Sequence, residues 1–459
     1  MYKFAPMKKI FTTLSLSALF FCSSVAQNNQ VQQPVRKCAS PKVNPSYEEY
    51  FQQMMLKHQQ FANARTTSTI YTIPIVFHII HSGVAVNSTS ATTGRNLNAA
   101  QINSQIAILN EDYRKTNSNF STYVTQAGLS SIAADVEINF CAAKVDPTGA
   151  VMAEPGIDRI STVAKGWNSL PYATAYIEST VKPGSSWDPT KYFNVWVLEF
   201  GGSDLGTLGY AQFPTIPSGT TPITDMVGQG GAANTDGVVI DYHYIGNTGT
   251  ALNASSAPYN KGRTLTHESG HWLGLWHIWG DDSNCSGSDY VADTPNQKTE
   301  NYTCPTTAGA VVTDQCTATS PGVNYQNYMD YSDDKCMAMF TAGQKARMQA
   351  VMANCVRRLS LATSTVCSVT GIEETVSNVE MSVYPNPTNG ELFVDVTTLD
   401  AQDFTISVVN TLGQTVKEVK QVQSNGGKIK IDLSDKNNGV YFVTLKSKAG
   451  SKVKRIVLQ

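Results

Sequence analysis

The pattern of apolar and polar positions divides the chain into stretches of different character. A β-branched run from Thr72 to Ile80 is typical of a buried strand. Residues 97–115 carry isoleucine and leucine at helical spacing, which predicts an amphipathic helix. Three further apolar runs are predicted to be strands: Val136–Cys141, Phe193–Phe200 and Val238–Tyr242. This mixture predicts a twisted mixed sheet backed by a long helix.

The pattern changes at Met381, where short alternating segments begin. Their period of two predicts strands at Leu392–Val396, Phe404–Val409, Lys428–Leu433 and Val440–Lys446, with Asn- and Gly-rich turns between them. Strands at this spacing predict a small all-β, Ig-like sandwich over residues 381–459, preceded by a linker over 363–380.

The N-terminus has the pattern of an export signal. Lysines precede an apolar run from Ile10 to Phe21, and small residues follow it up to Ala26, so residues 1–26 are predicted to be a cleaved signal peptide. The polar, Gln-rich residues 27–65 are interpreted as a propeptide that ends at Arg65, in a hinge open to proteolysis. No later segment has 18 consecutive apolar residues, so no transmembrane segment is expected.

Composition narrows the classes of partner. Charged residues make up 15% of the 459 residues, and the formal net charge is −2. Nucleic acid is therefore not an expected partner, and we expect a soluble monomer. Of the nine cysteines, all but Cys22 follow the predicted signal, and export makes them disulfide candidates first. The segment from Cys285 to Cys336 is predicted to be a long loop held by two bridges.

The segment His-Glu-Ser-Gly-His-Trp-Leu-Gly-Leu-Trp-His holds three of the seven histidines. On a helix, His267 and His271 project from one face and can meet one cation. Glu268 lies close enough to contact a metal-bound water without being a ligand. Gly274 can end the helix with a positive φ, so that His277 turns back as a third ligand.

Three imidazoles without a fourth protein ligand leave an open position, which is typical of catalytic rather than structural zinc. Zinc lowers the pKa of its water towards about 7, and Glu268 accepts the proton as the water attacks a polarised carbonyl. The motif therefore predicts a zinc-dependent metalloendopeptidase that hydrolyses peptide bonds.

This motif resembles the signature of the metzincin zinc peptidases. The segment Asn327–Cys336 resembles their methionine turn, with Met329 packed beneath the metal. Together with the loop Asp289–Pro295, these motifs are similar to the pappalysin family, in its cytophagalysin and ulilysin branch. The resemblance covers roughly residues 70–362. It implies an α+β metzincin domain, which we place at residues 66–362.

Several roles follow from this resemblance alone. Tyr331 matches a tyrosine that approaches the zinc and assists the oxyanion, although ordinary packing also explains a tyrosine there. The family's two loop disulfides correspond to Cys285 with Cys316 and Cys304 with Cys336. The family's calcium loop corresponds to Asp289, Asp293 and Thr294, which are otherwise solvated polar residues.

The resemblance also indicates where a substrate binds. Asp333 and Asp334 follow the methionine turn, where a carboxylate in the primed-side pocket favours Arg or Lys after the scissile bond. Both can equally be calcium or solvent contacts. Gly209 and Tyr210 lie in a segment that resembles the edge strand along which peptide substrates extend, or else a buried edge.

Upstream, Arg36-Lys37-Cys38-Ala39 resembles the family's latency motif, in which the thiolate of Cys38 fills the open zinc position. The alternative is a bridge from Cys38 to Cys141.

The C-terminal region is similar to the sorting domain of type IX secretion. The similarity rests on Tyr-Pro-Asn-Pro from residue 384 and on the basic last strand, and the alternative is a carbohydrate-binding sandwich.

We therefore expect a latent, secreted enzyme that acts on proteins or peptides and engages the type IX machinery through its tail. The rival hypothesis is an inactive secreted binding protein or adhesin on the metzincin scaffold. Such a protein would be expected to lose its general base, and Glu268 is present.

Overall fold

The structure is a computed structural model that describes residues 36–40, 45–62, 70–86, 95–215, 231–368, 379–410, 414–447 and 450–459. The predicted signal peptide, Arg65 and most of the predicted linker lie outside these residues. The catalytic region up to residue 368 and the tail from residue 379 are each described on their own.

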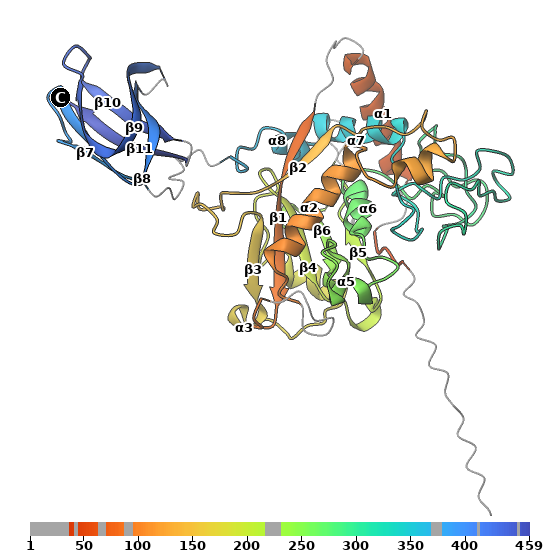
Figure 1. Ribbon diagram of the computed structural model, residues 1–459. Helices are drawn as coiled ribbons and strands as arrows, with labels where there is room; N and C mark the ends of the chain where they lie inside the picture. The colour runs from red at the N-terminus through yellow and green to blue at the C-terminus, as the bar shows by residue number, and fades with distance from the viewer. Residues whose placement is uncertain are drawn as a thin grey trace, which may run out of the picture. The chain divides into compact units, whose positions relative to one another are not determined.

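The catalytic region is built on a six-stranded mixed sheet (Figure 1). Its strands are β1 (Tyr71–His81), β2 (Ile138–Ala142), β3 (Ile157–Ser161), β4 (Phe193–Leu198), β5 (Gly209–Ala211) and β6 (Val238–Asp241). Strand β1 pairs in parallel with β2 and β3 along one edge and with β4 along the other. Strand β6 follows β4 in parallel, and β5 closes the sheet as its only antiparallel strand. The predicted mixed sheet is confirmed, with β3 as a strand that the sequence pattern did not indicate.

Alternation along β1 separates the two faces of the sheet. Ile73, Ile75 and Phe77 face a core that also contains the buried residues of α2 (Ala99–Tyr113) and α6 (Arg263–Trp272). The α2 helix begins where the Asn98 side chain accepts a hydrogen bond from the Gln101 N–H. Figure 1 shows α2 lying against the sheet beside α6. The backing helix therefore lies on the same side of the sheet as the histidine motif.

Helix α1 (Pro45–Ala62) is part of this core, although its residues fall within the predicted propeptide. Tyr47, Phe51, Met54 and Met55 follow helical spacing and belong to the same buried cluster as the α6 residues. The buried Glu48 forms a bidentate ion pair with Arg347 of α7 (Ala342–Asn354), with both N–O distances at 2.5 Å. The sequence pattern assigned these residues to the propeptide and did not predict that they pack into this core.

The other helical segments are short. The α-helices are α3 (Thr162–Lys165), α4 (Thr174–Tyr176), α5 (Ala251–Ser255) and α8 (Val356–Leu361). The π- and 3-10 turns are η1 (Ser121–Thr125), η2 (Ile177–Val181), η3 (Gly202–Asp204), η4 (Ala233–Thr235) and η5 (Tyr242–Tyr244). Residues 273–341, all of them described, contain no helix or strand and are cross-linked by disulfides Cys285–Cys316 and Cys304–Cys336.

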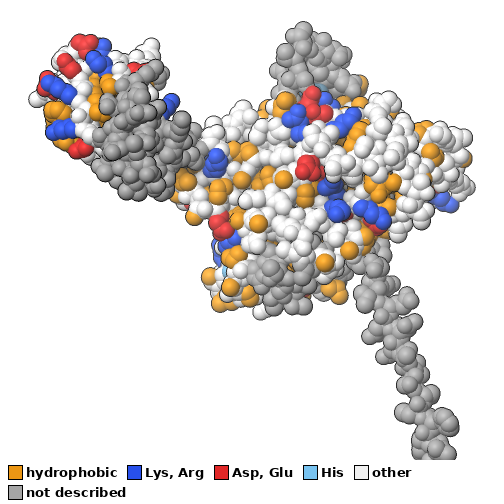
Figure 2. Space-filling view, in the orientation of Figure 1, with side chains coloured by type: hydrophobic (Ala, Val, Ile, Leu, Met, Phe, Trp, Pro, Cys, Tyr) orange, Lys and Arg blue, Asp and Glu red, His pale blue; other side chains and the backbone are white. Residues whose placement is uncertain are grey.

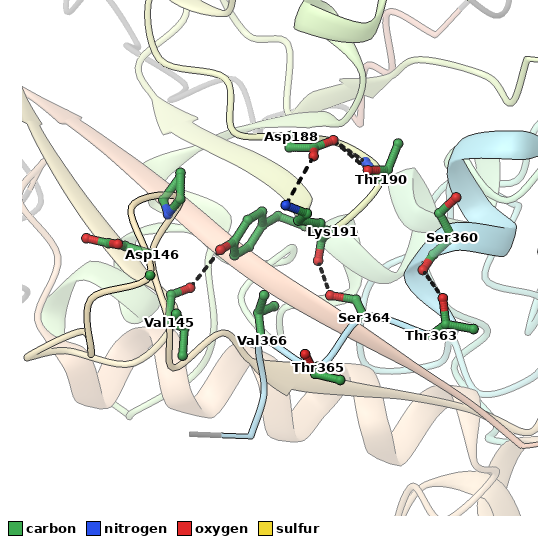
Figure 3. Close-up of a pocket in the computed structure, with 13 residues that line it drawn as sticks. Val145, Asp146, Asp188, Thr190, Lys191, Ser360, Thr363, Ser364, Thr365 and Val366 are labelled. Carbon is green, nitrogen blue, oxygen red and sulfur yellow. Dashed lines mark hydrogen bonds and ion pairs between the residues drawn. The ribbon is translucent and has the colours of Figure 1, made fainter. Parts of the chain in front are cut away.

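A third disulfide, Cys141–Cys367, joins β2 to the end of the catalytic region. The proposed alternative bridge from Cys38 to Cys141 is therefore wrong. Beside it lies a pocket of about 580 Å³ in which the Ser364 hydroxyl donates to the Lys191 carbonyl (Figure 3). The two acidic side chains of its lining, Asp146 and Asp188, accept hydrogen bonds from Thr148 and Thr190 within their own turns.

The tail is all-β, as predicted. Its strands are β7 (Val379–Tyr384), β8 (Glu391–Asn410), β9 (Thr415–Asp432), β10 (Gly439–Ser447) and β11 (Gly450–Leu458). Two predicted strands merge into β8, whose first half pairs with β7 and whose second half pairs with β10. The β8–β9 ladder shifts register after Thr397, in the stretch where the other partner of β8 changes from β7 to β10. Such irregularities are bulges, which bend a long strand so that its two halves can belong to different layers.

On the face shown in Figure 2, charged side chains are of mixed sign, sparse over the catalytic region and more frequent on the described part of the tail. Among the described helices, none combines the length and apolar character needed to cross a bilayer.

Candidate metal centre

The three motif histidines converge at the C-terminal end of α6. His267 and His271 lie on one face of the helix, and Leu273 ends it with N–H bonds to the preceding turn. Gly274 then adopts a φ of +89°, which strongly favours glycine and reverses the chain so that His277 returns to the same point. The His271 Nε2 atom lies 3.2 Å from that of His267 and 3.1 Å from that of His277.

The outer nitrogens determine what these rings can bind. The Nδ1 atoms of His267 and His271 lie 2.7 and 2.8 Å from the carbonyl oxygens of Tyr328 and Leu275, and His277 Nδ1 lies 2.6 Å from Asp281 Oδ1. All three partners are acceptors, so each Nδ1 carries the hydrogen and each Nε2 presents a lone pair. Three buried lone pairs facing one another need a cation. Two nitrogens at about 2.0–2.1 Å from a tetrahedral zinc are about 3.3 Å apart, so the residues fit this metal.

Residues 36–40 fill the cleft in front of the histidines. The Cys38 Sγ and the three imidazoles form a group whose ligand atoms lie within 4.8 Å of one another. The Cys38 thiol and the Ser40 hydroxyl both donate to Glu268 Oε2, at 3.3 and 3.0 Å. Main-chain bonds join this segment to the edge strand, from Ala39 N–H to the Gly209 carbonyl and from Leu208 N–H to the Lys37 carbonyl. Residues 36–40 thus lie both beside the three imidazoles and along the edge of the sheet.

Burial sets the protonation states in the cleft. It lowers the pKa of His271 to about 3 and that of His267 well below its usual value, which keeps both imidazoles in the neutral form that binds metals. Burial also raises the pKa of the Glu268 carboxyl to about 7, although the hydrogen bonds from Cys38 and Ser40 oppose this rise. A carboxyl that titrates near neutrality suits a general base.

Two residues of the turn segment pack around the histidines. A side chain on Gly270 would lie 2.4 Å from the Met329 sulfur, so the helix and the methionine approach each other closely because that position is glycine. The Tyr331 ring centre lies 5.0 Å from that of His277 and 5.7 Å from that of His267. Burial raises the pKa of the Tyr331 phenol, which keeps it protonated as a donor.

A buried pocket beside the histidines holds the Arg36 side chain. Its guanidinium lies 2.5 Å from Asp334 Oδ1 and 4.8 Å from the centre of the Tyr259 ring. Asp334 is held in place by the main-chain N–H groups of Lys261 and Arg263. Asp333 does not share this geometry, since its carboxyl lies near the main chain of Cys304.

Other residues named from the sequence lie in different settings. The Tyr210 side chain faces the opposite side of the sheet from the histidines and donates to Glu178. The Thr294 hydroxyl lies 2.8 Å from each carboxylate oxygen of Asp289 and 2.7 Å from the Val291 carbonyl. The Asp293 carboxylate instead accepts bonds from Thr341 and Gly343 at the start of α7.

Sequence reasoning missed three residues of this region. Ser40 donates to the Glu268 carboxylate, Asp281 contacts His277, and Glu48 accepts from the indole of Trp276 in the loop between two histidines. The first two lie within four residues of named candidates, so proximity was an available signal. Glu48 lies in a polar segment far from the motif and gave no comparable signal.

Comparison with known proteins places this geometry among the peptidases. Residues 175–353 match the M43 peptidase family described as pregnancy-associated plasma protein-A, and residues 382–459 match the secretion system C-terminal sorting domain. An extracellular metalloprotease of Pyricularia oryzae is 31% identical over 59% of this chain and 72% of its own length. An extracellular metalloprotease of Colletotrichum graminicola is 28% identical over 74% and 96%.

Two solved structures from Tannerella forsythia are also similar. Mature mirolysin in complex with a cleaved peptide is 38% identical, with a TM-score of 0.53, over 66% of this chain and all of its own. A promirolysin mutant is 35% identical, with a TM-score of 0.52, over 72% of this chain and 98% of its own. Nothing among these relatives supports the rival hypothesis of an inactive binding protein or adhesin. The chain therefore belongs to the pappalysin family of metallopeptidases, as a secreted zinc metalloendopeptidase with a C-terminal type IX sorting domain.

Proposed function

We propose that His267, His271 and His277 bind the catalytic zinc and that Glu268 is the general base of a latent endopeptidase. The convergence of three Nε2 lone pairs beside a buried carboxylate carries this proposal. When bound, zinc polarises the scissile carbonyl and acidifies the attacking water. Glu268 Oε2, which Cys38 and Ser40 cover in this form, accepts the proton of that water and returns it to the leaving amine.

Tyr331 and the edge strand complete the proposed site. The protonated phenol of Tyr331 stands beside two of the histidine rings and is placed to donate to the developing oxyanion. The main chain of β5 at Gly209 and Tyr210 binds an extended peptide. The hydrogen bonds that residues 37–40 already make with Leu208, Gly209 and Ala211 support this assignment.

The proposed substrate preference is for a basic residue after the scissile bond. The ion pair of the Arg36 guanidinium with the buried Asp334 carboxylate supports this preference. Asp334→Asn keeps the shape of this side chain and removes its charge. We expect it to lower kcat/KM for peptides with Arg at this position by about 10- to 100-fold, while peptides with Leu there are unaffected, because a charge-assisted hydrogen bond is worth about 1.5–3 kcal/mol.

Cleavage-site mapping by mass spectrometry on a mixed peptide library measures this preference. Asp333→Asn is the matched control and should keep the parent's preference. If Asp334→Asn still favours Arg, the pocket has another role.

Cys38 is proposed to hold the zymogen inactive as a fourth metal ligand. The full chain with Cys38→Ser is expected to process itself faster than the parent, because serine is a weaker zinc ligand than a thiolate. Lys37→Ala, at an exposed position of the same segment, is the control. A time course on gels with N-terminal sequencing also tests cleavage after Arg65. Equal latency of the two variants would remove Cys38 from the inhibitory mechanism.

Calcium is proposed to bind at Asp289 and Thr294 with the Val291 carbonyl, without Asp293. The Asp289 carboxylate and the Val291 carbonyl both lie within 2.8 Å of the Thr294 hydroxyl, and burial raises the pKa of the Asp289 carboxyl to about 7, a cost that a hard cation offsets. Adding Ca²⁺ after EGTA treatment should raise the Tm of the parent and of Asp293→Asn but not that of Asp289→Asn. If adding Ca²⁺ leaves the Tm of the parent unchanged, the proposed calcium site is wrong.

The domain layout is proposed as a signal over 1–26, a propeptide over 27–65, a peptidase from 66 and a sorting domain over 381–459. The Cys141–Cys367 bridge supports moving the end of the peptidase from residue 362 to about 368, because Cys367 is fixed to β2. The linker then shortens to roughly 369–380.

A further inference from the structure

The three histidines of the metal centre are not supported in the same way. The Nδ1 atoms of His267 and His271 donate to main-chain carbonyls, that of Tyr328 in the turn segment and that of Leu275 just after α6. His277 stands outside the helix, and its Nδ1 partner is the Asp281 carboxylate at 2.6 Å. The third ligand is thus the only one of the three whose orientation depends on a charged side chain.

The local chain is shaped to bring this carboxylate to the ring. Gly280 N–H bonds to the His277 carbonyl in a tight turn, and Asp281 follows with a φ of +53°. For a residue other than glycine this conformation costs roughly 1 kcal/mol. The strained backbone directs the carboxylate to the imidazole, with the His277 and Asp281 side chains only 5% and 13% exposed.

A second contact of His277, with the Trp279 indole, restricts the ring but does not by itself fix its orientation. The Trp279 indole lies parallel to the His277 imidazole, with ring centres 4.4 Å apart and an interplanar angle of 7°. Stacking fixes the plane of the ring but is compatible with two orientations related by a half-turn about the Cβ–Cγ bond. The hydrogen bond from Nδ1 to Asp281 selects one of them and so sets the direction of Nε2.

We propose that Asp281 is a positioning residue for the metal, which orients His277 towards the other two histidines and strengthens it as a ligand. A carboxylate behind a ligating imidazole raises the donor strength of the far nitrogen and fixes its tautomer. The proposal rests on the proposed zinc site, and it assigns Asp281 no contact with the substrate.

The positive φ allows a test that separates metal binding from folding. Asp281→Gly removes the carboxylate and relieves the backbone, so a residue needed only for local structure would be replaced without loss. Asp281→Asn keeps an acceptor and also tolerates this conformation. Asp282→Asn is the matched control, because Asp282 bonds to Asn284 and Ser286 and not to a histidine.

Zn²⁺ affinity is measured on the full chain by competition with a chromogenic chelator, in a Glu268→Gln background that prevents self-cleavage. The series is repeated with Cys38→Ser so that a fourth donor does not mask the effect. We expect Asp281→Gly to raise the Kd for Zn²⁺ by about 10- to 100-fold, Asp281→Asn to raise it less, and Asp282→Asn to match the parent. The Tm of the metal-free Asp281→Gly protein should equal or exceed that of the parent.

Tight Zn²⁺ binding by both Asp281 variants would overturn the inference. So would a loss of affinity in Asp281→Gly accompanied by an equal loss of stability in the metal-free protein. A parent that fails to bind Zn²⁺ would instead overturn the proposed metal site, which keeps the two failures distinct.

Discussion

Glu268→Ala is expected to lower kcat/KM for casein or peptide cleavage by about 10²- to 10⁴-fold while the zinc content stays at that of the parent. Glu268 stands next to His267 on α6, and its carboxylate is within 3.3 Å of the thiol that occupies the cleft. It is therefore close enough to exchange a proton with a group at that position. It does not belong to the group of side chains that can hold the metal.

The measurement needs an external activating protease, because a chain without its general base cannot process itself. Parent and variant are cut by the same trypsin-like protease, and N-terminal sequencing establishes that both have lost the segment containing Cys38. Glu111→Gln, at an exposed position of α2, is the control and should retain full activity. Glu268→Gln separates charge from shape, and we expect it to be as inactive as the alanine variant. Full activity in Glu268→Ala would refute the mechanism.

The meeting of the three histidines was predictable because its information is local. The four-residue spacing of His267 and His271 places both on one helix face, and Gly274 marks the point where the chain must turn. The strand at β1 was equally clear, because a buried central strand is apolar on both faces. In each case the deciding interactions lie within a few residues, where periodicity and turn chemistry are informative.

What the sequence did not predict depends on contacts between distant segments. Glu48 and Arg347 lie 299 residues apart, and neither is unusual in its own neighbourhood. Strand β3 is a five-residue segment with three polar positions, and it becomes a strand only because β1 offers it an edge. The merging of two predicted strands into β8 depends on bulges, which no alternation pattern marks.

Glu48→Ala is expected to destabilise the zymogen by about 3–5 kcal/mol, because removing one partner leaves the buried Arg347 guanidinium without its counter-charge. The same change removes the acceptor of the Trp276 indole, which stands next to His277 in the chain. Arg347 also donates to the Gly274 carbonyl, so the ion pair joins α1 directly to the loop that carries the third histidine. Glu49→Ala, at an exposed position of the same helix, should change stability by less than about 0.5 kcal/mol.

The alkylation rate of the buried Cys355 thiol measures whether α1 has undocked from the core. Cys355 is a free cysteine whose sulfur lies 3.8 Å from that of Met54, and burial raises the pKa of its thiol to about 12. A docked helix therefore keeps Cys355 unreactive towards alkylating reagents. In a Cys38→Ser, Glu268→Gln background, which cannot process itself, Glu48→Ala should increase the labelling rate of Cys355 by at least about 100-fold, since each 1.4 kcal/mol of lost docking energy is a factor of ten.

Comparing the Tm with the Cys355 labelling rate shows whether Glu48→Ala destabilises the protein by undocking α1. A lower Tm with faster Cys355 labelling means that α1 undocks and that the Glu48–Arg347 pair holds it in place. A Tm and a labelling rate equal to those of Glu49→Ala would show that apolar burial of Tyr47, Phe51 and Met54 holds the helix without the ion pair. In an enzyme cleaved after Arg65 and freed of α1, Cys355 should label quickly whatever residue stands at position 48, because the helix that covers it is gone.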